Sequence, residues 1–301
     1  MRLGLFTACL PGRTLPEIAS WAAATGYQAL EVACWPVGPT RPFTPCHLDV
    51  TSCDAAEVLG ILGQHGLVIS SLAFYENNLH SEPGTRRQVN DHLAACIDAA
   101  AELGCPTVGT FIGRDPGKTV SENLQEAGRV FPRLVDRARE QGVSIVVENC
   151  VMEGWHPDGY PGNLAYSPEL WEWMFSLGLY LNFDPSHLVW LGIDPVAALR
   201  PYVDRVLHVQ AKDIEAFPEK RNRYGFPGRA VGREPWNSGW WRYRIPGLGQ
   251  IEWHRIIDAL YEGNYQGVIS VEHEDPVWGG SAEKTEAGLE LAHRALAPLL
   301  I

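Results

Sequence analysis

Short apolar runs of strand length alternate eight times with amphipathic stretches of helix length along this chain. That alternation is typical of βα units whose strands form a parallel sheet. Eight units favour a closed (β/α)8 TIM barrel over an open doubly wound sheet, and no G-x-G-x-x-G motif supports a dinucleotide-binding fold. The predicted strands cover residues 3–7, 29–33, 68–74, 107–111, 144–149, 179–184, 206–211 and 268–273.

The stretches between these strands carry apolar residues at three- and four-residue spacing, and most of them end in glycine, a common helix stop. A barrel of this kind needs about 250 residues, so residues 1–301 are expected to form one α/β domain. The predicted helices are 14–26, 55–66, 86–104, 120–142, 167–178, 194–202, 253–264 and 282–300.

Residues 212–250 interrupt the rhythm as a long loop between strand seven and helix seven, rich in Trp, Arg, Gly and Pro. Loops of this length inside a compact domain usually serve the active site. Beyond Lys212 and Asp213 the loop holds Lys220 and six arginines against three glutamates. Arg244 and its neighbours therefore predict either a clamp for a substrate anion or ion pairs with nearby acids or a second subunit.

The net charge of −12 and pI near 5.3 disfavour nucleic acid and anionic membranes as partners. The apolar N-terminus is broken by Pro11 and is predicted to be the first strand rather than a signal sequence. Seven cysteines without a C-x-x-C pair indicate reduced thiols and a cytoplasmic protein. A homo-oligomer is left open.

Acidic or imidazole side chains occupy the ends of the last four predicted strands: Glu148, Asp184, His208 and Glu272. Because the carboxyl ends of barrel strands face the active-site mouth, these side chains are expected to converge. Converging carboxylates repel one another unless a cation neutralises them. The pattern predicts one divalent metal ion, with Mn²⁺ as the leading expectation and Mg²⁺, Co²⁺ or Zn²⁺ as alternatives.

The strings VVENC, NFDPSHL, HVQAKD and VEHEDP, together with WWRYRIPGLGQIEW, resemble the xylose isomerase-like TIM-barrel superfamily of sugar phosphate isomerases and epimerases. The resemblance covers essentially the whole chain. It implies a metal held by the strand-five Glu, strand-six Asp, strand-seven His and strand-eight Glu, which are Glu148, Asp184, His208 and Glu272 here. It also implies that Glu148 and Glu272 act as catalytic base and acid.

Further residues are candidates for binding a small sugar or polyol. His187 stands where the family places a ligand of a substrate hydroxyl, although a histidine at a helix start is also often exposed to water. Lys212 is expected to bind a substrate oxygen or to pair with Asp213 or Glu215. Trp35 and Tyr75 are expected to form pocket walls or to pack loops.

The resemblance implies proton transfer at the carbon next to the carbonyl of a keto sugar or sugar derivative, through a metal-stabilised enediolate. A close alternative is a dehydratase of the inosose dehydratase type, in which the same intermediate expels a β-hydroxyl group. An apurinic-site endonuclease would need more histidines at the strand ends and a less acidic chain. A non-catalytic binding barrel is the remaining alternative, which the complete ligand set disfavours.

Overall fold

The structure is a computed structural model that describes residues 1–38, 41, 43–155, 160–226 and 236–301. Eight parallel strands close into a barrel in the order β1-β10-β7-β6-β5-β4-β3-β2, which confirms the predicted (β/α)8 fold. These strands are β1 (Arg2–Phe6), β2 (Ala29–Ala33), β3 (Val68–Asn77), β4 (Thr107–Phe111), β5 (Ser144–Glu148), β6 (Tyr180–Phe183), β7 (Val206–Ala211) and β10 (Val268–Val271).

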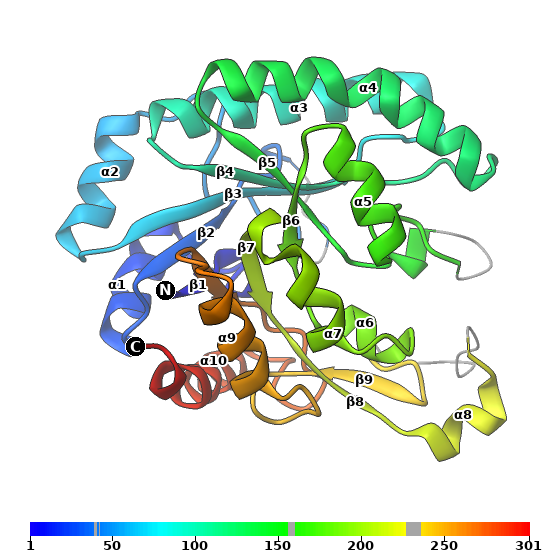
Figure 1. Cartoon of the computed structure of the whole chain (residues 1–301). Helices are drawn as coiled ribbons and strands as arrows, with labels where there is room; N and C mark the ends of the chain where they lie inside the picture. The colour runs from blue at the N-terminus through cyan, green and yellow to red at the C-terminus, as the bar shows by residue number, and fades with distance from the viewer. Residues whose placement is uncertain (39–40, 42, 156–159, 227–235) are drawn as a thin grey trace.

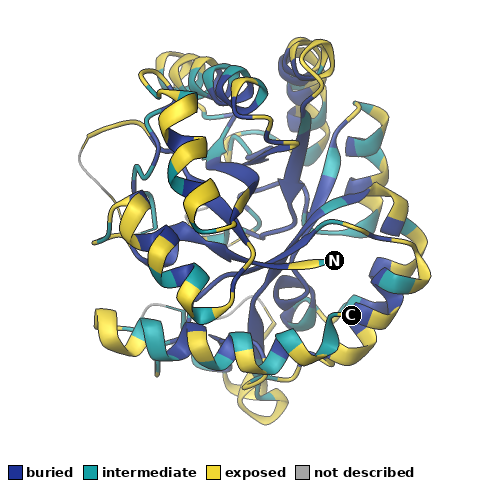
Figure 2. Ribbon diagram, turned by 90° about the vertical axis from the view of Figure 1, so that its left-hand side faces the viewer, coloured by how far each residue is buried: buried dark blue, intermediate teal, exposed yellow. Residues whose placement is uncertain are grey.

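Helices surround the barrel and turn their exposed faces outward, while the strands between them are buried (Figures 1 and 2). Burial on both faces explains why the strands appear in the sequence as nearly continuous apolar runs. The helices are α1 (Leu15–Thr25), α2 (Ala55–Gln64), α3 (Pro83–Glu102), α4 (Val120–Glu140), α5 (Pro168–Ser176), α6 (Ser186–Trp190), α7 (Pro195–Leu199), α9 (Trp253–Glu262) and α10 (Ala282–Leu296). Short 3-10 turns are η1 (Thr7–Cys9), η2 (Glu153–Trp155), η3 (Arg200–Arg205) and η4 (Ala297–Leu299).

Local sequence signals fix the ends of several helices. Thr14 and Glu17 form a capping box at the start of α1, and Gly26 ends that helix in the left-handed region at φ 104°. Thr119 and Glu122 form the same box at the start of α4. Both helices therefore begin within one residue of the start that the sequence pattern predicts.

The long connection after β7 contains ordered structure that the sequence did not predict. Strand β8 (Asp213–Ala216) pairs antiparallel with β9 (Trp241–Arg244), and helix α8 (Pro218–Tyr224) lies between them in sequence. Residues 227–235, which include Arg229 and Arg233, lie outside the described residues. In Figure 1 this β8–β9 ribbon lies on the opposite side of the barrel from the two termini.

Strand β7 carries an irregularity that decides which of its side chains reach the mouth. Leu181 pairs with Val206, but the next residue, Asn182, pairs with His208, so Leu207 is an extra residue on β7. A bulge of this kind re-aims the side chains that follow it. Continuing the register brings Asp184, two residues past Asn182, level with Gln210.

No helix in the described part of the chain is long and apolar enough to cross a membrane. The seven cysteines all lie among the described residues and are free thiols.

Candidate active site

Three buried carboxylates meet at the carboxyl ends of the barrel strands. Glu148 is the last residue of β5, Asp184 follows β6, and Glu272 follows β10. One oxygen from each lies within 4.8 Å of the others. Asn149 holds the backbone of Asp184 in place, since its amide donates to the Asp184 carbonyl at 2.7 Å and accepts from the Asp184 N–H at 2.7 Å. We call Glu148, Asp184 and Glu272 the three-carboxylate group.

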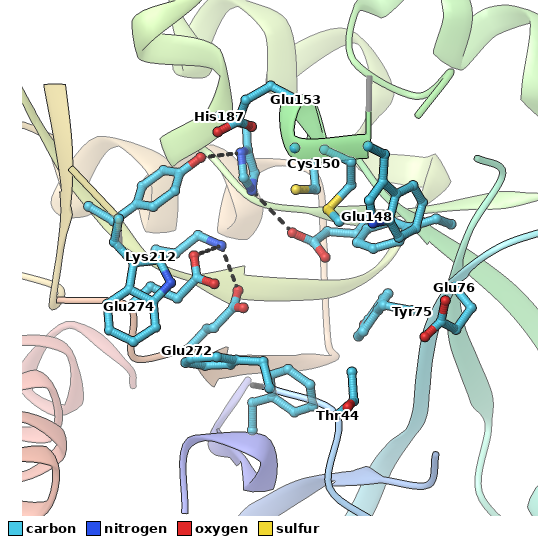
Figure 3. Close-up of a pocket in the computed structure, with 18 of the residues that line it drawn as sticks. Thr44, Tyr75, Glu76, Glu148, Cys150, Glu153, His187, Lys212, Glu272 and Glu274 are labelled. Atoms are coloured by element: carbon cyan, nitrogen blue, oxygen red, sulfur yellow. Dashed lines mark hydrogen bonds and ion pairs between the residues drawn. The ribbon is translucent and has the colours of Figure 1, made fainter. Parts of the chain in front are cut away.

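Lys212 lies against this group and is 2% exposed. Its Nζ is 2.9 Å from Glu272 Oε2 and 3.1 Å from Glu274 Oε2 (Figure 3). It also lies 3.1 Å from Asp184 Oδ2. Burial alone would lower the pKa of Lys212, but Glu272, Glu274 and Asp184 raise it well above its usual value. The alternative partners expected from the sequence, Asp213 and Glu215, lie elsewhere: Asp213 accepts hydrogen bonds from the backbone N–H groups of residues 214, 247 and 251.

The electrostatics separate two of the carboxylates. Burial raises the pKa of Glu272 well above its usual value, and Glu274 and Glu148 add to this while Lys212 opposes it. Burial also acts to raise the pKa of Asp184, but Lys212 and His187 outweigh it and lower that pKa to about 2. Asp184 is therefore the more firmly ionised of the two carboxyl groups.

His187, at the start of α6, is buried in the site, so the alternative of a water-exposed histidine is wrong. Its Nδ1 lies 2.8 Å from the Tyr243 hydroxyl, and its Nε2 lies 3.2 Å from Glu148 Oε1 and 3.3 Å from Asp184 Oδ2. Tyr243 belongs to β9, so the ribbon orients this ring. The sequence analysis did not identify Tyr243 as a site residue, and no local signal pointed to it.

His208 is not brought to the three-carboxylate group. Its Nδ1 lies 3.1 Å from Asn182 Oδ1 and its Nε2 lies 3.1 Å from Ser70 Oγ, so both ring nitrogens are engaged deeper in the barrel. Burial lowers the pKa of His208 to about 3, which keeps the ring neutral. The expected role of His208 as a metal ligand is therefore not supported by its position.

Gln210 is the β7 side chain that lies level with Asp184, two residues beyond His208 on the same face of the strand. Its Nε2 donates to Glu31 Oε1 at 3.1 Å and to the Tyr75 hydroxyl at 3.3 Å. The Gln210 Oε1 atom is buried and has no hydrogen-bond partner. The alternation of inward side chains along 206–211 could have identified Gln210, had the bulge at Leu207 been known.

A cavity of about 330 Å³ opens beside these groups, at the small end of the range for small-molecule sites. Both predicted wall residues line it. Trp35 donates through Nε1 to Glu76 Oε1 at 3.0 Å, and Tyr75 donates to Glu31 Oε1 at 2.5 Å. Burial raises the pKa of Glu31 to about 7. The cavity is also lined by Glu148, Cys150, His187, Lys212, Tyr243 and Glu272.

Arg244 does not line this cavity. Its Nε lies 2.9 Å from Asp275 Oδ2 and its Nη1 lies 2.8 Å from Glu215 Oε2, and Arg242 also pairs with Glu215. Arg242 and Arg244 therefore form ion pairs with nearby acids, which is one of the two alternatives predicted for the loop arginines. Arg244 thus fastens the ribbon to the loop after β10, and the structure does not place it at a substrate.

The donor atoms fit a divalent cation. Counted formally, Glu148, Asp184, Glu272 and Glu274 carry four negative charges, which Lys212 offsets by only one. Asp184 Oδ2 and Gln210 Oε1 are buried without a hydrogen bond, although the former touches Lys212 and His187. Unsatisfied buried oxygens beside excess negative charge are the environment that a hard divalent cation stabilises.

Comparison with known proteins gives a consistent result. A family model described as xylose isomerase-like TIM barrel matches residues 19–296. An inosose dehydratase from Clostridium perfringens is 30% identical over 174 residues, which cover 55% of this chain and 50% of that protein. The chain thus spans about half the length of the curated relatives it matches.

Solved structures share the fold. An L-ribulose 3-epimerase superposes with a TM-score of 0.71 at 14% identity, covering 99% of this chain and 94% of that one. The IOLI protein, whose structure carries a bound zinc atom, superposes with a TM-score of 0.69 at 17% identity, covering 99% and 96%.

Proposed function

Since the chain belongs to the xylose isomerase-like TIM-barrel family, we propose that it is a divalent-metal-dependent isomerase or epimerase of a keto sugar or keto polyol. The reaction is the transfer of a proton at the carbon next to the substrate carbonyl. The observation that carries this proposal is the convergence of three buried carboxylates at the edge of a cavity sized for a small molecule.

The metal would be held by Glu148, Asp184, Glu272 and the amide oxygen of Gln210, the last of these in place of the expected His208. Oxygen donors of this kind suit Mn²⁺ or Mg²⁺. When bound, such a cation acts as a Lewis acid that polarises the substrate carbonyl.

The protein side chains divide the remaining work. Glu148 and Glu272 border the same cavity and provide a base and an acid for the substrate carbon. Burial raises the pKa of Glu272, which suits this residue to hold a proton. His187 presents Nε2 toward Glu148, where it binds a substrate hydroxyl, and Lys212 holds the Asp184 and Glu272 carboxylates in position.

The charges around the cavity favour an unphosphorylated substrate. Among the described residues that line the cavity, the Lys and Arg side chains are Lys212 and Arg41, and each already pairs with a carboxylate. The lining glutamates would repel a phosphate group. The aromatic walls, including Trp35 and Phe111, suit the apolar face of a sugar or cyclitol ring.

A second candidate is dehydration, favoured by the match to an inosose dehydratase. Both reactions begin with removal of the same proton. They differ in whether a β-hydroxyl group then leaves, and in a dehydration His187 would protonate that group. We therefore treat the two as outcomes of one experiment.

The test is a hydrogen–deuterium exchange screen in D₂O with Mn²⁺, using unphosphorylated keto sugars and inososes and following the substrate by NMR. Deuterium incorporation with retention of all hydroxyls indicates epimerisation or isomerisation, whereas loss of a hydroxyl indicates dehydration. Glu148→Gln and Glu272→Gln should each slow exchange by about 10²–10⁴-fold, the usual contribution of a general acid or base.

Glu274→Gln is the matched control, because it removes a carboxylate from the same cavity and leaves Glu148, Asp184 and Glu272 in the chain. It should retain measurable exchange. Undiminished exchange in both Glu148→Gln and Glu272→Gln would remove these residues from proton transfer.

A further inference from the structure

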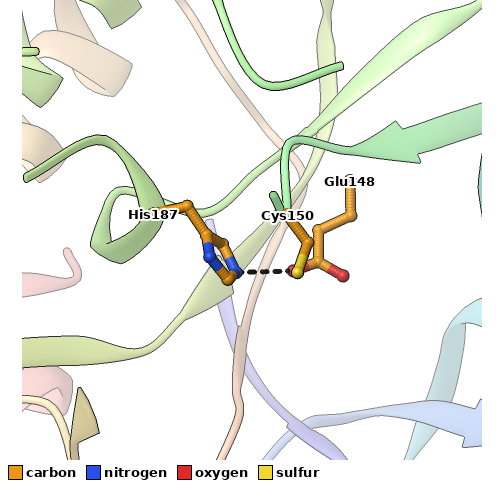
Figure 4. A group of neighbouring side chains, drawn as sticks. All are labelled: Glu148, Cys150 and His187. Atoms are coloured by element: carbon orange, nitrogen blue, oxygen red, sulfur yellow. Dashed lines mark hydrogen bonds and ion pairs between the residues drawn. The ribbon is translucent and has the colours of Figure 1, made fainter. Parts of the chain in front are cut away.

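A second group of metal-binding side chains lies beside the three-carboxylate group and shares Glu148 with it. Cys150, His187 and Glu148 each place one ligand atom within 4.8 Å of the other two, and all three are buried (Figure 4). We propose that this Glu148–Cys150–His187 group is a second cation position, selective for thiophilic cations such as Zn²⁺, whose occupation inhibits the enzyme. The inhibitory part rests on the proposed function.

The spacing suits a tetrahedral ion. Zinc bonds of about 2.0 Å to nitrogen and oxygen put neighbouring ligand atoms about 3.3 Å apart. His187 Nε2 and Glu148 Oε1 are 3.2 Å apart. Cys150 follows Glu148 by two residues at the end of β5, so one short segment supplies two of the three ligand atoms.

The Tyr243 hydroxyl already orients the imidazole of His187. Metal-bound histidines almost always engage their other ring nitrogen with a hydrogen-bond partner, which fixes the tautomer and the ring direction. In this site His187 Nδ1 lies 2.8 Å from the Tyr243 hydroxyl, which leaves Nε2 facing Glu148 and the cavity. Asn163 fixes the strand end, donating to the carbonyls of Glu148 at 3.0 Å and Cys150 at 2.9 Å.

The two groups differ in chemical softness. The three-carboxylate group offers only oxygen, which Mg²⁺ and Mn²⁺ accept readily. The Glu148–Cys150–His187 group offers sulfur, nitrogen and oxygen, and soft sulfur selects Zn²⁺ over those ions. All three of its residues line the cavity, so a cation from solution reaches them along the substrate path, with the fourth position open to water. Binding replaces the S–H bond of Cys150 and the Nε2–H bond of His187 with bonds to zinc, and both protons pass to solvent.

Occupation of this position has a consequence for catalysis. It engages Glu148 and His187, which the proposed function assigns to proton transfer and hydroxyl binding. Carboxylate-bridged cations lie about 3.5–4 Å apart in known two-metal sites, so a second ion would also fill space beside the first. Zinc in excess should therefore inhibit, while Mn²⁺ in excess should not.

Metal stoichiometry provides a test that does not depend on activity. Metal-free wild-type protein is equilibrated with Zn²⁺ or with Mn²⁺, and bound metal is counted by mass spectrometry and by titration calorimetry. We expect two Zn²⁺ but one Mn²⁺ per chain. Cys150→Ser should bind one of either ion, whereas Cys53→Ser, which alters a partly exposed thiol, should keep two Zn²⁺.

Co²⁺ supplies an independent signature. A sulfur-to-cobalt charge-transfer band should accompany the second equivalent in wild-type protein and should be missing in Cys150→Ser. His187→Gln serves as a second variant if Cys150→Ser does not fold, and it should also lose the second Zn²⁺. One Zn²⁺ in wild-type protein with no sulfur band would overturn the second position while leaving the proposed function intact. Failure to bind any cation would overturn both.

Discussion

Two layers of polar side chains lie one above the other inside the barrel. They differ in how far hydrogen bonds satisfy their buried polar groups. The lower layer consists of Ser70, Asn182 and His208, which are hydrogen-bonded to one another and carry no charge. The upper layer is the three-carboxylate group with Lys212 and Gln210, and it combines excess negative charge with unsatisfied oxygens. Hydrogen bonds within the lower layer satisfy its polar groups, whereas under the proposed function a bound cation completes the upper layer.

The difference shows how function can be located without a ligand. Buried polar groups are normally satisfied by hydrogen bonds, so a satisfied layer indicates structure. A layer left with orphaned oxygens beside paired charges indicates a place for something else to bind. Two histidines divide accordingly: His208 on β7 belongs to the lower layer, and His187 on α6 contacts the carboxylates of the upper layer.

The largest expected effect on stability comes from removing the ammonium group of Lys212, the positively charged side chain of the upper layer. Lys212→Met leaves several buried carboxylates without a positive charge nearby. Removing one member of a buried ion pair costs about 3–5 kcal/mol of stability. In chelator-treated protein the free energy of unfolding in urea should fall by that amount. Added Mn²⁺ should recover part of the loss.

Lys118→Met is the control, since Lys118 is 37% exposed and pairs at the surface with Asp115 at 3.7 Å. Its effect should stay within about 0.5 kcal/mol. Equal stability of Lys212→Met and wild-type protein without metal would mean that the upper layer does not depend on this charge.

The next effect concerns the lower layer and appears as pH dependence. The unfolded chain protonates His208 near pH 6.5, but burial lowers the pKa of the folded protein's ring to about 3. The contribution to stability is therefore complete above pH 6.5 and is lost as pH falls, by about 1.4 kcal/mol per unit or about 2 kcal/mol from pH 6.5 to 5.

His208→Gln should lose this part of the slope when metal-free unfolding is measured across that range, whatever its effect on absolute stability. His254→Gln, at an exposed position on α9, should keep the wild-type slope. If the free energy of unfolding falls equally with pH in wild-type protein and in His208→Gln, then His208 accepts a proton easily in the folded state.

The smallest effect distinguishes two residues on one strand. Gln210→Leu should weaken Mn²⁺ binding by about tenfold, or about 1.4 kcal/mol, because it removes an oxygen donor from the upper layer. His208→Gln should leave the affinity nearly unchanged. Calorimetric titration of both variants checks the order, and the reverse order would restore His208 as the ligand expected from the sequence.

Sequence reasoning reached the fold and the three carboxylates because both depend on local pattern. Apolar runs mark buried strands, and residues such as Glu148 and Glu272 directly follow those runs. It placed His208 in the upper layer instead of the lower one, because the bulge at Leu207 appears only in the pairing of β7 with β6. It did not identify Tyr243, because β8 and β9 have only four residues each, too few to show an alternating apolar pattern. The two strands also lie far apart in the sequence.

The stacking of Trp190 on Trp241, with ring centroids 5.0 Å apart and planes 12° apart, has a bearing on how such proteins diverge. Trp190 ends the short helix that begins at Ser186 beside His187, and Trp241 begins the strand that carries Tyr243. A change in the ribbon would therefore move His187, which under the proposed function binds a substrate hydroxyl, while the barrel strands keep their sequence. If that proposal holds, the range of substrates can change through this one insertion without a change in the carboxylates at the strand ends.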